Sequence, residues 1–205
     1  NLLKLDPSTI HSIMAPHKLQ NSWVIWELKE KQGSADSKDY GNLVREVCEF
    51  STVEDFWKYW MFIPKPSDVF GDGQNKILVE GRIIKAFCLF KKGIQPRWED
   101  VANKTGSELV ASKSYSPEVL DVFWENLVMG LIGETIDEGD EICGCRVVNQ
   151  TRKGKPTYKI ELWLRTTDES MGLKIKSKLS DVLTDFEGNK PGSKIRAPEF
   201  EIIKH

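Results

Sequence analysis

The sequence predicts an α+β domain, with one antiparallel sheet of about seven or eight strands and helices packed on one of its faces. Strand-like runs rich in β-branched and aromatic residues recur along the chain, with helical patterns interspersed among them. Most connections between successive runs are short, which suits antiparallel pairing. The length of 205 residues, of which 40% are hydrophobic, fits one domain with a buried core. Helices on one face would leave the other face free for a ligand.

Prolines separate a flexible N-terminal segment, residues 1–16, from the single domain that is expected over residues 17–205. Pro7 and Pro16 interrupt any continuous element in this segment. The domain is predicted to begin with two strands joined by a polar loop, at 22–30 and 43–50.

A capping box predicts the first helix. Ser51 and Glu54 stand three residues apart at the start of an apolar helical pattern, so the helix should begin there and end before Pro64. Residues 64–85 form an enlarged inserted segment. It is predicted to open as a Pro- and Gly-containing loop and to close as two short strands around a hairpin turn at Glu80–Gly81.

Cap residues also mark the helix of the second half. Ser116 precedes a proline at the first helical position and an acidic residue in the first turn, so a helix should begin there and end at Gly133. An amphipathic pattern predicts a third helix at 169–183. The remaining strands are predicted at 86–92, 108–113, 141–150, 157–165 and 199–204.

Three large side chains fall off the apolar stripes that these helices would bury: Trp57, Trp124 and Met129. An exposed tryptophan on a helix is a candidate contact for a partner protein. The alternative is a half-buried side chain at the edge of the core.

A tryptophan stands beside a carboxylate in the stretch 93–100, Gly-Ile-Gln-Pro-Arg-Trp-Glu-Asp. Gly93 and Pro96 break the preceding strand, so Trp98 and Glu99 should lie on a loop at a strand end. An indole can stack on a base, and a carboxylate can accept parallel hydrogen bonds from N1–H and N2–H₂ of guanine. The alternative is a Trp98 that plugs the edge of the core beside a solvated Glu99.

Positive charge gathers between two predicted strands, at Arg152, Lys153, Lys155 and Lys159. The chain has a net charge of −2, so any binding of nucleic acid must rest on such a local patch. Arginine can bind phosphate through two donors and lysine as a point charge. A solvated hairpin turn is the alternative, and the phosphate interpretation gains only if the patch lies near the loop at 93–100.

The sequence argues against an enzyme, a metal site and a membrane span. Glycine motifs lack the spacing of nucleotide-binding loops, and the three histidines, near the termini, form no catalytic set. The acidic run at 137–141 is interpreted as a solvated loop. The four cysteines form no metal-binding pair and are interpreted as reduced, buried thiols, so a cytoplasmic location without a cofactor is expected.

Motifs in order along residues 18–183 resemble the mRNA cap-binding translation initiation factor 4E family. They are the stretches 17–23 with Trp26, 52–57, 93–100, 123–124 with 131–134, and 143–149 with Trp163. This resemblance implies a single curved antiparallel sheet of about eight strands, backed by three helices on its convex face. It also implies that the concave face binds the 7-methylguanosine cap at the 5′ end of mRNA.

The resemblance implies a role for individual residues at such a cap site. Tyr40 and Trp98 would sandwich the methylated base, Glu99 would read its edge, and Trp163 would line the N7-methyl group. The phosphates would lie against the basic residues Arg152, Lys153, Lys155 and Lys159. No bond is broken, so the expected function is recognition and not catalysis.

The helical face would hold a second site, for an initiation-factor scaffold protein or an inhibitor with a short helical motif. The residues implied for it are His17, Val53, Trp57, Met129 and Gly133. The protein is expected to act as a monomer.

Two other functions compete with this one. The first is a translational repressor or adaptor of the same fold with weak cap binding. It is suggested by the tyrosine at position 40, and by Glu125 and Asn126, which replace a leucine and a glutamate of the family. An enzyme acting on a nucleotide is the second, which the lack of a catalytic cluster disfavours.

Overall fold

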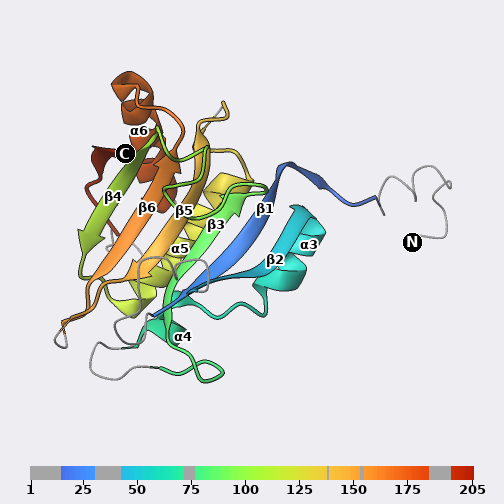
Figure 1. The fold of residues 1–205 in the computed structure, drawn as a ribbon, viewed down its shortest axis with the longest axis vertical. Coiled ribbons are helices and arrows are strands. Elements are labelled where there is room, and N and C mark those ends of the chain that lie inside the picture. The colour runs from blue at the N-terminus through green and yellow to red at the C-terminus, as the bar shows by residue number, and fades with distance from the viewer. Residues whose placement is uncertain (1–14, 31–42, 72–76, 138, 153–154, 185–194) are drawn as a thin grey trace.

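The computed structural model describes residues 15–30, 43–71, 77–137, 139–152, 155–184 and 195–205, and these residues form seven strands and four helices (Figure 1). The strands are β1 (Lys18–Lys29), β2 (Val44–Thr52), β3 (Ile84–Lys91), β4 (Ser107–Lys113), β5 (Ile142–Asn149), β6 (Tyr158–Leu164) and β7 (Glu201–Lys204). The helices are α3 (Val53–Trp60), α4 (Pro66–Phe70), α5 (Pro117–Ile132) and α6 (Glu169–Thr184). All strands pair antiparallel in one sheet of order β2-β1-β3-β5-β6-β4-β7, which confirms the predicted α+β class.

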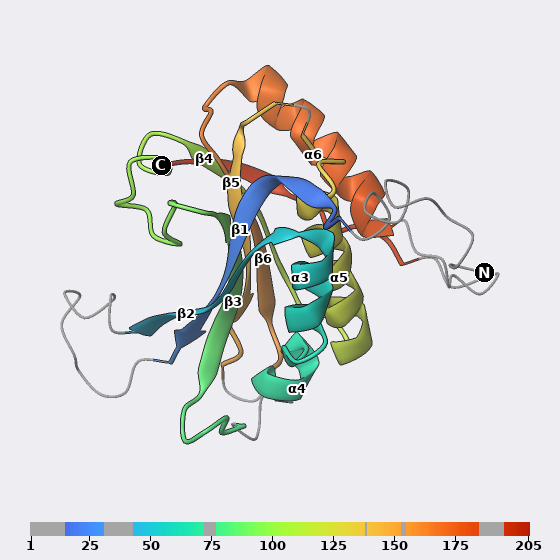
Figure 2. The ribbon, with the colours of Figure 1, turned by 90° about the vertical axis from the view of Figure 1, so that its right-hand side faces the viewer.

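The helices cover one face of a curved sheet (Figure 2). α3, α5 and α6 lie on this side, which we call the helix face, and α4 lies below α3 and α5. The loop between β3 and β4 lies on the opposite side of the sheet, which we call the open face. The predicted arrangement, with helices on one face only, is therefore confirmed for the described residues.

The period-two alternation of the strands divides the apolar side chains between the two faces. In β3, Phe87 and Leu89 belong to the large core under the helices, whereas Cys88 and Phe90 belong to a smaller cluster on the open face. Helix α5 fills the centre of the large core with fully buried side chains, Leu120, Phe123 and Leu127. Burial of this apolar surface is the dominant favourable contribution to folding.

The helix ends follow the predicted caps, with one correction at α3. Ser116 caps α5, and Gly133 ends it. For α3 the cap is Thr52 and not Ser51, since the Thr52 side chain accepts a hydrogen bond from the backbone N–H of Asp55 at 3.1 Å. Glu54, the second residue of the predicted capping box, bonds to His17 instead. Its carboxylate accepts a hydrogen bond from the backbone N–H of His17 at 2.9 Å and lies 2.6 Å from His17 Nδ1.

The inserted segment contains a short helix that the sequence interpretation missed. Residues 66–70 form α4, where a loop was predicted, because Pro66 begins a helical turn and Asp68 accepts a hydrogen bond from the backbone N–H of Lys65. Val69 and Phe70 are buried, so the turn is fixed by packing. The predicted hairpin turn is confirmed: Glu80 and Gly81 both have positive φ, and the backbones of Val79 and Arg82 bond to each other in both directions.

The seven strands and four helices of the described residues agree with the expected sheet of about eight strands backed by helices, and an isolated bridge between Val79 and Arg82 precedes β3. One further expectation needs correction. Trp124 was placed off the core stripe, but it is 3% exposed and packs beside Trp60 and Phe87. Residues 1–14, most of the predicted N-terminal segment, lie outside the described residues, as do residues 72–76 of the inserted segment.

Candidate functional site

The loop between β3 and β4 holds Trp98 and Glu99 at the surface. Trp98 is 62% exposed and Glu99 is exposed, so this indole does not plug the edge of the core. Asp100 closes the loop by accepting hydrogen bonds from the backbone N–H groups of Gln95 and Ala102, at 2.9 and 3.0 Å. The backbone, and not the packing of the indole, therefore sets the position of the two side chains.

Asn103 forms a second closure inside the same loop. It is fully buried, and its side-chain Nδ2 donates to the carbonyl groups of Gln95 and Arg97 at 2.9 and 2.8 Å. These two carbonyls flank the turn that presents Trp98. An asparagine is suited to this place because its amide carries two donors and is short enough to stay within one loop.

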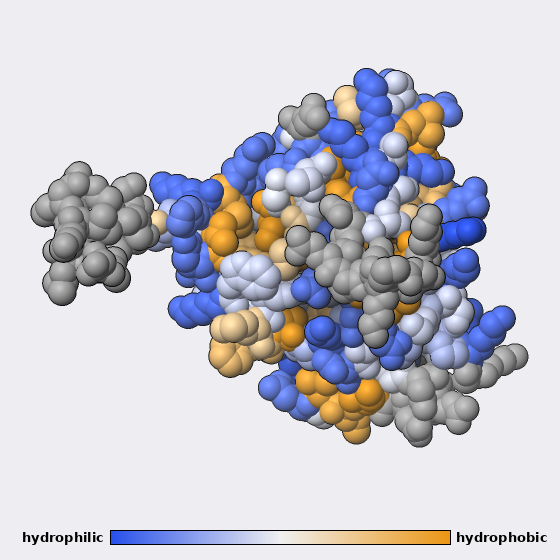
Figure 3. Space-filling model, turned by 180° about the vertical axis from the view of Figure 1, so that it is seen from behind, coloured by the Kyte–Doolittle hydropathy of each residue, from blue (hydrophilic) through white to orange (hydrophobic). Residues whose placement is uncertain are grey.

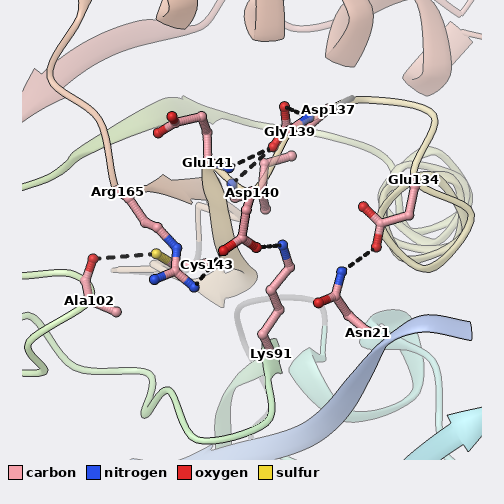
Figure 4. A network of polar contacts seen from close by, with 11 residues as sticks. Asn21, Lys91, Ala102, Glu134, Asp137, Gly139, Asp140, Glu141, Cys143 and Arg165 are labelled. Carbon is pink, nitrogen blue, oxygen red and sulfur yellow. Dashed lines mark hydrogen bonds and ion pairs between the residues drawn. The ribbon is translucent and has the colours of Figure 1, made fainter.

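The loop is fastened to the open face of the sheet. Ile94 and Ala102 pack with the apolar cluster of that face, and Cys143 of β5 donates its S–H to the carbonyl of Ala102 at 3.4 Å (Figure 4). At the end of the loop, Gly106 approaches the carbonyl of Leu164 so closely that a Cβ would lie 1.9 Å from the oxygen. A side chain at that position would push the loop away from β6.

A network of ion pairs joins three strands beside this loop (Figure 4). Lys91, at the end of β3, is buried and donates from Nζ to Asp140 at 2.7 Å, and Arg165 lies 3.4 Å from the same carboxylate. The hydrogen bond from Lys91 has the largest effect on the pKa of Asp140 and lowers it, and the charges of Lys91 and Arg165 lower it further. Asp137 accepts hydrogen bonds from the backbone N–H groups of Gly139 and Glu141, at 2.9 and 2.8 Å. The acidic run predicted to be a solvated loop thus has a structural role.

Trp163 lies on the open face, in the same apolar cluster as Phe90 and Ile94. Its indole is 5% exposed and meets the rings of Phe90 and His205 edge to face, with centroid distances of 5.6 and 5.2 Å. His205 is tied to the β3–β4 loop, because its Nδ1 lies 2.7 Å from the Asn103 carbonyl. The structure therefore places Trp163 on the same face as the loop that carries Trp98 and Glu99.

Glu161, which the sequence interpretation did not single out, joins the charged groups of this face. The Trp163 Nε1–H donates to Glu161 Oε2 at 2.9 Å, and Lys159 Nζ lies 2.7 Å from the other carboxylate oxygen. Arg146 approaches Oε2 to 3.2 Å through its Nε, and its guanidinium lies 5.5 Å from the centre of the Trp163 ring. The three contacts fix both the indole and the two cations.

The pKa values of Glu161 and Glu108 shift in opposite directions. Burial raises the pKa of Glu161, but the charges of Arg146 and Lys159 outweigh it, so the net pKa lies below the ordinary value. Glu108 lies 3.9 Å from Lys159 Nζ, and burial together with the charge of Glu161 raises the pKa of Glu108. Lys159, predicted as a phosphate ligand, is therefore already held between carboxylates.

Two other predicted phosphate ligands, Arg152 and Lys155, lie at the hairpin between β5 and β6. Arg152 and Lys155 are exposed and form an isolated bridge there, in which the Lys155 N–H donates to the Arg152 carbonyl at 3.1 Å. The strand register puts this hairpin at the end of β5 next to Ala86, whereas Trp163 pairs at the other end, next to Phe90. The predicted phosphate set is thus divided along the strands. Tyr40 and Lys153 lie outside the described residues.

The predicted partner-binding residues lie around α3 and the end of α5. Val53 and Trp57 are 38% and 46% exposed, and Gly133 is exposed, while Met129 is half-buried. His17 contacts Glu54 of α3, as described above. In the space-filling view of the helix face, apolar side chains gather over α3 at the left (Figure 3).

The exposed apolar surface continues beyond α3. Met61 and Phe62, which follow the helix, are 72% and 82% exposed. A cavity of 420 Å³ lies beside them. Its lining includes aromatic, apolar and acidic side chains, among them Trp60, Ile63, Trp124, Asp121 and Glu125. Among the described residues, no cluster of three or more histidine, cysteine or acidic side chains could hold a metal ion. None of the described helices is long and apolar enough to cross a membrane.

Four polar residues of this site were missed at the level of sequence: Asp100, Asn103, Arg146 and Glu161. Aspartate and asparagine are frequent in turns, so the first two carried a signal for loop closure. The other two are charged residues inside strands that are rich in apolar residues. A charge at such a position indicates a buried ion pair, but the register needed to find its partner was not known.

Residues 18–192 match the family model for eukaryotic initiation factor 4E. A Drosophila melanogaster protein described as eukaryotic translation initiation factor 4E1 is 35% identical over 169 residues, which are 82% of this chain and 58% of that protein. The chain belongs to the eukaryotic initiation factor 4E family. The resemblance found in the sequence is therefore confirmed, although the chain spans little more than half of that relative's length.

Two solved structures of the initiation factor 4E family share this fold. Caenorhabditis elegans initiation factor 4E-3, in complex with the 4E-binding protein Mextli and a cap analogue, is 32% identical, with a TM-score of 0.65 over 85% of this chain and 89% of that one. Ascaris suum initiation factor 4E-3, solved with an m7G cap, is 29% identical, with a TM-score of 0.67 over 91% of this chain and 98% of that one. The cap ligands and Mextli are bound by these relatives.

Proposed function

We propose that this chain binds the 7-methylguanosine cap at the 5′ end of mRNA and recruits a scaffold protein for translation initiation. One observation carries the proposal: a closed loop presents an exposed Trp98 and Glu99 beside the open face, in a family whose relatives are solved with cap ligands. The action is recognition without catalysis, and we place it in the cytoplasm, where mRNA is translated.

The chemistry of the cap suits these two side chains. Methylation at N7 gives guanine a delocalised positive charge, so stacking on Trp98 combines dispersion with cation–π attraction. Stacking contributes about 1–3 kcal/mol per base, and a desolvated cation–π contact about 2 kcal/mol. Glu99 would accept hydrogen bonds from N1–H and N2–H₂. Trp163 would line the methyl group, and Tyr40 would be the second aromatic of the sandwich.

The phosphates would lie along the basic residues of β6 and the β5–β6 hairpin. Lys159 is on the open face itself, and Arg152, Lys153 and Lys155 would bind phosphates farther along the strands. Because Lys159 is paired with Glu161, a phosphate must compete with a carboxylate for it. The phosphate contribution should therefore depend more on the hairpin than the family resemblance alone implies.

The exposed surface of α3 suits a helical motif of a scaffold protein or of an inhibitor. Trp57 is a large, half-exposed anchor, and Val53 with the exposed Met61 extends the apolar surface around it. His17, Met129 and Gly133 would border the bound helix. We propose one domain over residues 17–205, acting as a monomer, in which the inserted segment 64–85 supports α5 through α4.

Quenching of tryptophan fluorescence by 7-methyl-GTP, with GTP as the control ligand, tests the cap site. We expect strong quenching by the methylated nucleotide and little by GTP. Glu99→Ala should weaken binding of 7-methyl-GTP by about tenfold or more, because two base donors lose their acceptor. Glu199→Ala removes an exposed carboxylate outside the proposed site and should change nothing.

Equal and weak responses to both nucleotides would contradict cap recognition. In that case a scaffold-motif peptide should be titrated against the wild type and Trp57→Ala. Tight binding that depends on Trp57 would then support the adaptor or repressor function of the same fold.

A further inference from the structure

Glu161 is the centre of a charged group that the cap proposal does not use. It is 2% exposed, and its two oxygens contact the indole N–H of Trp163, the Lys159 ammonium and the Arg146 guanidinium. Glu108 stands on the far side of Lys159. The two cations of this group, Lys159 and Arg146, are therefore balanced by carboxylates in the same layer of side chains.

This balance bears on how a nucleotide is held. A nucleoside triphosphate carries several negative charges and is attracted by any surplus of positive charge, whether or not its base is methylated. A surplus on the open face would raise the affinity for every nucleotide. A neutral face leaves the base, with its methyl group and positive charge, to decide the affinity.

We propose that Glu161 is a specificity-determining residue, which neutralises Lys159 and Arg146 so that phosphate attraction alone does not hold an unmethylated nucleotide. The proposal rests on the cap-binding function proposed above. Glu161 also places negative charge at the edge of the Trp163 indole, beside the expected position of the N7-methyl group. That charge favours a cationic base over a neutral one, which selects for methylation, whereas its effect on the phosphates lowers the affinity for both triphosphates.

Glu161→Gln tests the proposal, because glutamine keeps the shape and a hydrogen-bond acceptor for the Trp163 N–H but removes the charge. The ligands are 7-methyl-GTP, GTP and the nucleoside 7-methylguanosine, which has no phosphates. We expect tighter binding of GTP and weaker binding of the nucleoside. The gain in phosphate attraction applies to both triphosphates, but only the methylated base loses the attraction of a nearby negative charge. The ratio of the affinities for 7-methyl-GTP and GTP should therefore fall by about tenfold, the effect of one such charge in a partly solvated site. The affinity for GTP should also depend more steeply on salt.

A purely structural role for Glu161 predicts a different pattern. Loss of the indole or lysine position would weaken both triphosphates together and leave their ratio unchanged, which would overturn the proposal. Glu169→Gln, at the start of α6 on the helix face, makes the same change in net charge. If this control shifted the ratio as much as Glu161→Gln, the effect would be global and the proposal would also fail.

The outcome can be separated from that of the cap proposal. A wild type without preference for 7-methyl-GTP would refute cap recognition itself. A selective wild type with an unaltered ratio in the variant would refute only the role of Glu161. If Glu161→Gln does not fold, Glu108→Gln removes the second carboxylate near Lys159, and its ratio should fall in the same direction by a smaller factor. An unchanged ratio in that variant would overturn the proposal.

Discussion

The two faces of the sheet differ in how their buried groups are held. On the helix face the sheet packs against α5 through fully buried apolar side chains such as Leu120, Phe123 and Leu127. On the open face a smaller apolar cluster around Phe90 and Trp163 adjoins ion pairs of Glu161. The centre of the helix face is therefore apolar, whereas the open face keeps charges beside its apolar cluster and balances them in ion pairs.

The largest expected effect separates stability from binding. Phe123→Ala should lower the free energy of unfolding by about 3–5 kcal/mol, because it leaves a cavity among side chains that cannot collapse into it. Urea denaturation measures the loss. The folded fraction should bind 7-methyl-GTP with wild-type affinity, and a matching loss of affinity would show that the two faces are not independent.

Trp98→Ala should give the reverse result. The side chain is largely exposed, so the free energy of unfolding should change by no more than about 0.5 kcal/mol. Binding of 7-methyl-GTP should weaken by about 1–3 kcal/mol through the lost stacking. Trp57→Ala is the matched control on the helix face. Calorimetric titration should show unchanged cap affinity for that control and weaker binding of a scaffold-motif peptide.

Asn103→Ala sharpens the comparison, since this residue would not touch the ligand. Its amide closes the loop from inside, and removing it leaves two loop carbonyls without their donor, at about 1–3 kcal/mol. We expect part of this cost to appear as weaker cap binding. Asn103→Asp keeps the size but not the donors and should behave in the same way. A variant with native cap affinity would contradict the role of the loop closure.

The smallest effect concerns pH. The folded-state pKa of Glu161 is lowered, so its ionisation stabilises the fold above the ordinary glutamate pKa of about 4.3, and this contribution is lost as the pH falls through the folded-state value. The difference in unfolding free energy between the wild type and Glu161→Gln should therefore shrink in acid. A difference that grows as the pH falls would contradict the assigned charge.

Sequence patterns predicted most of the sheet and the helix that begins at Ser116, because alternation and caps are local signals. Trp98 and Glu99 were also found, since a glycine and a proline place them on a loop. Trp124 was misplaced, because helical periodicity does not show that Trp60 of α3 and Phe87 of the sheet pack against it. Glu161 and Arg146 could not be paired without the register of β5 and β6, which only tertiary structure sets.

The indole N–H resonances of the tryptophans test most directly whether the two faces serve different ligands. Addition of 7-methyl-GTP should shift the Trp98 and Trp163 resonances and leave those of Trp57 and Trp60 in place. A scaffold-motif peptide should shift the Trp57 resonance and leave that of Trp98 unchanged. Single Trp→Phe variants assign the signals. A shift of the Trp57 resonance by 7-methyl-GTP, with that of Trp98 unmoved, would contradict the placement of the cap on the open face.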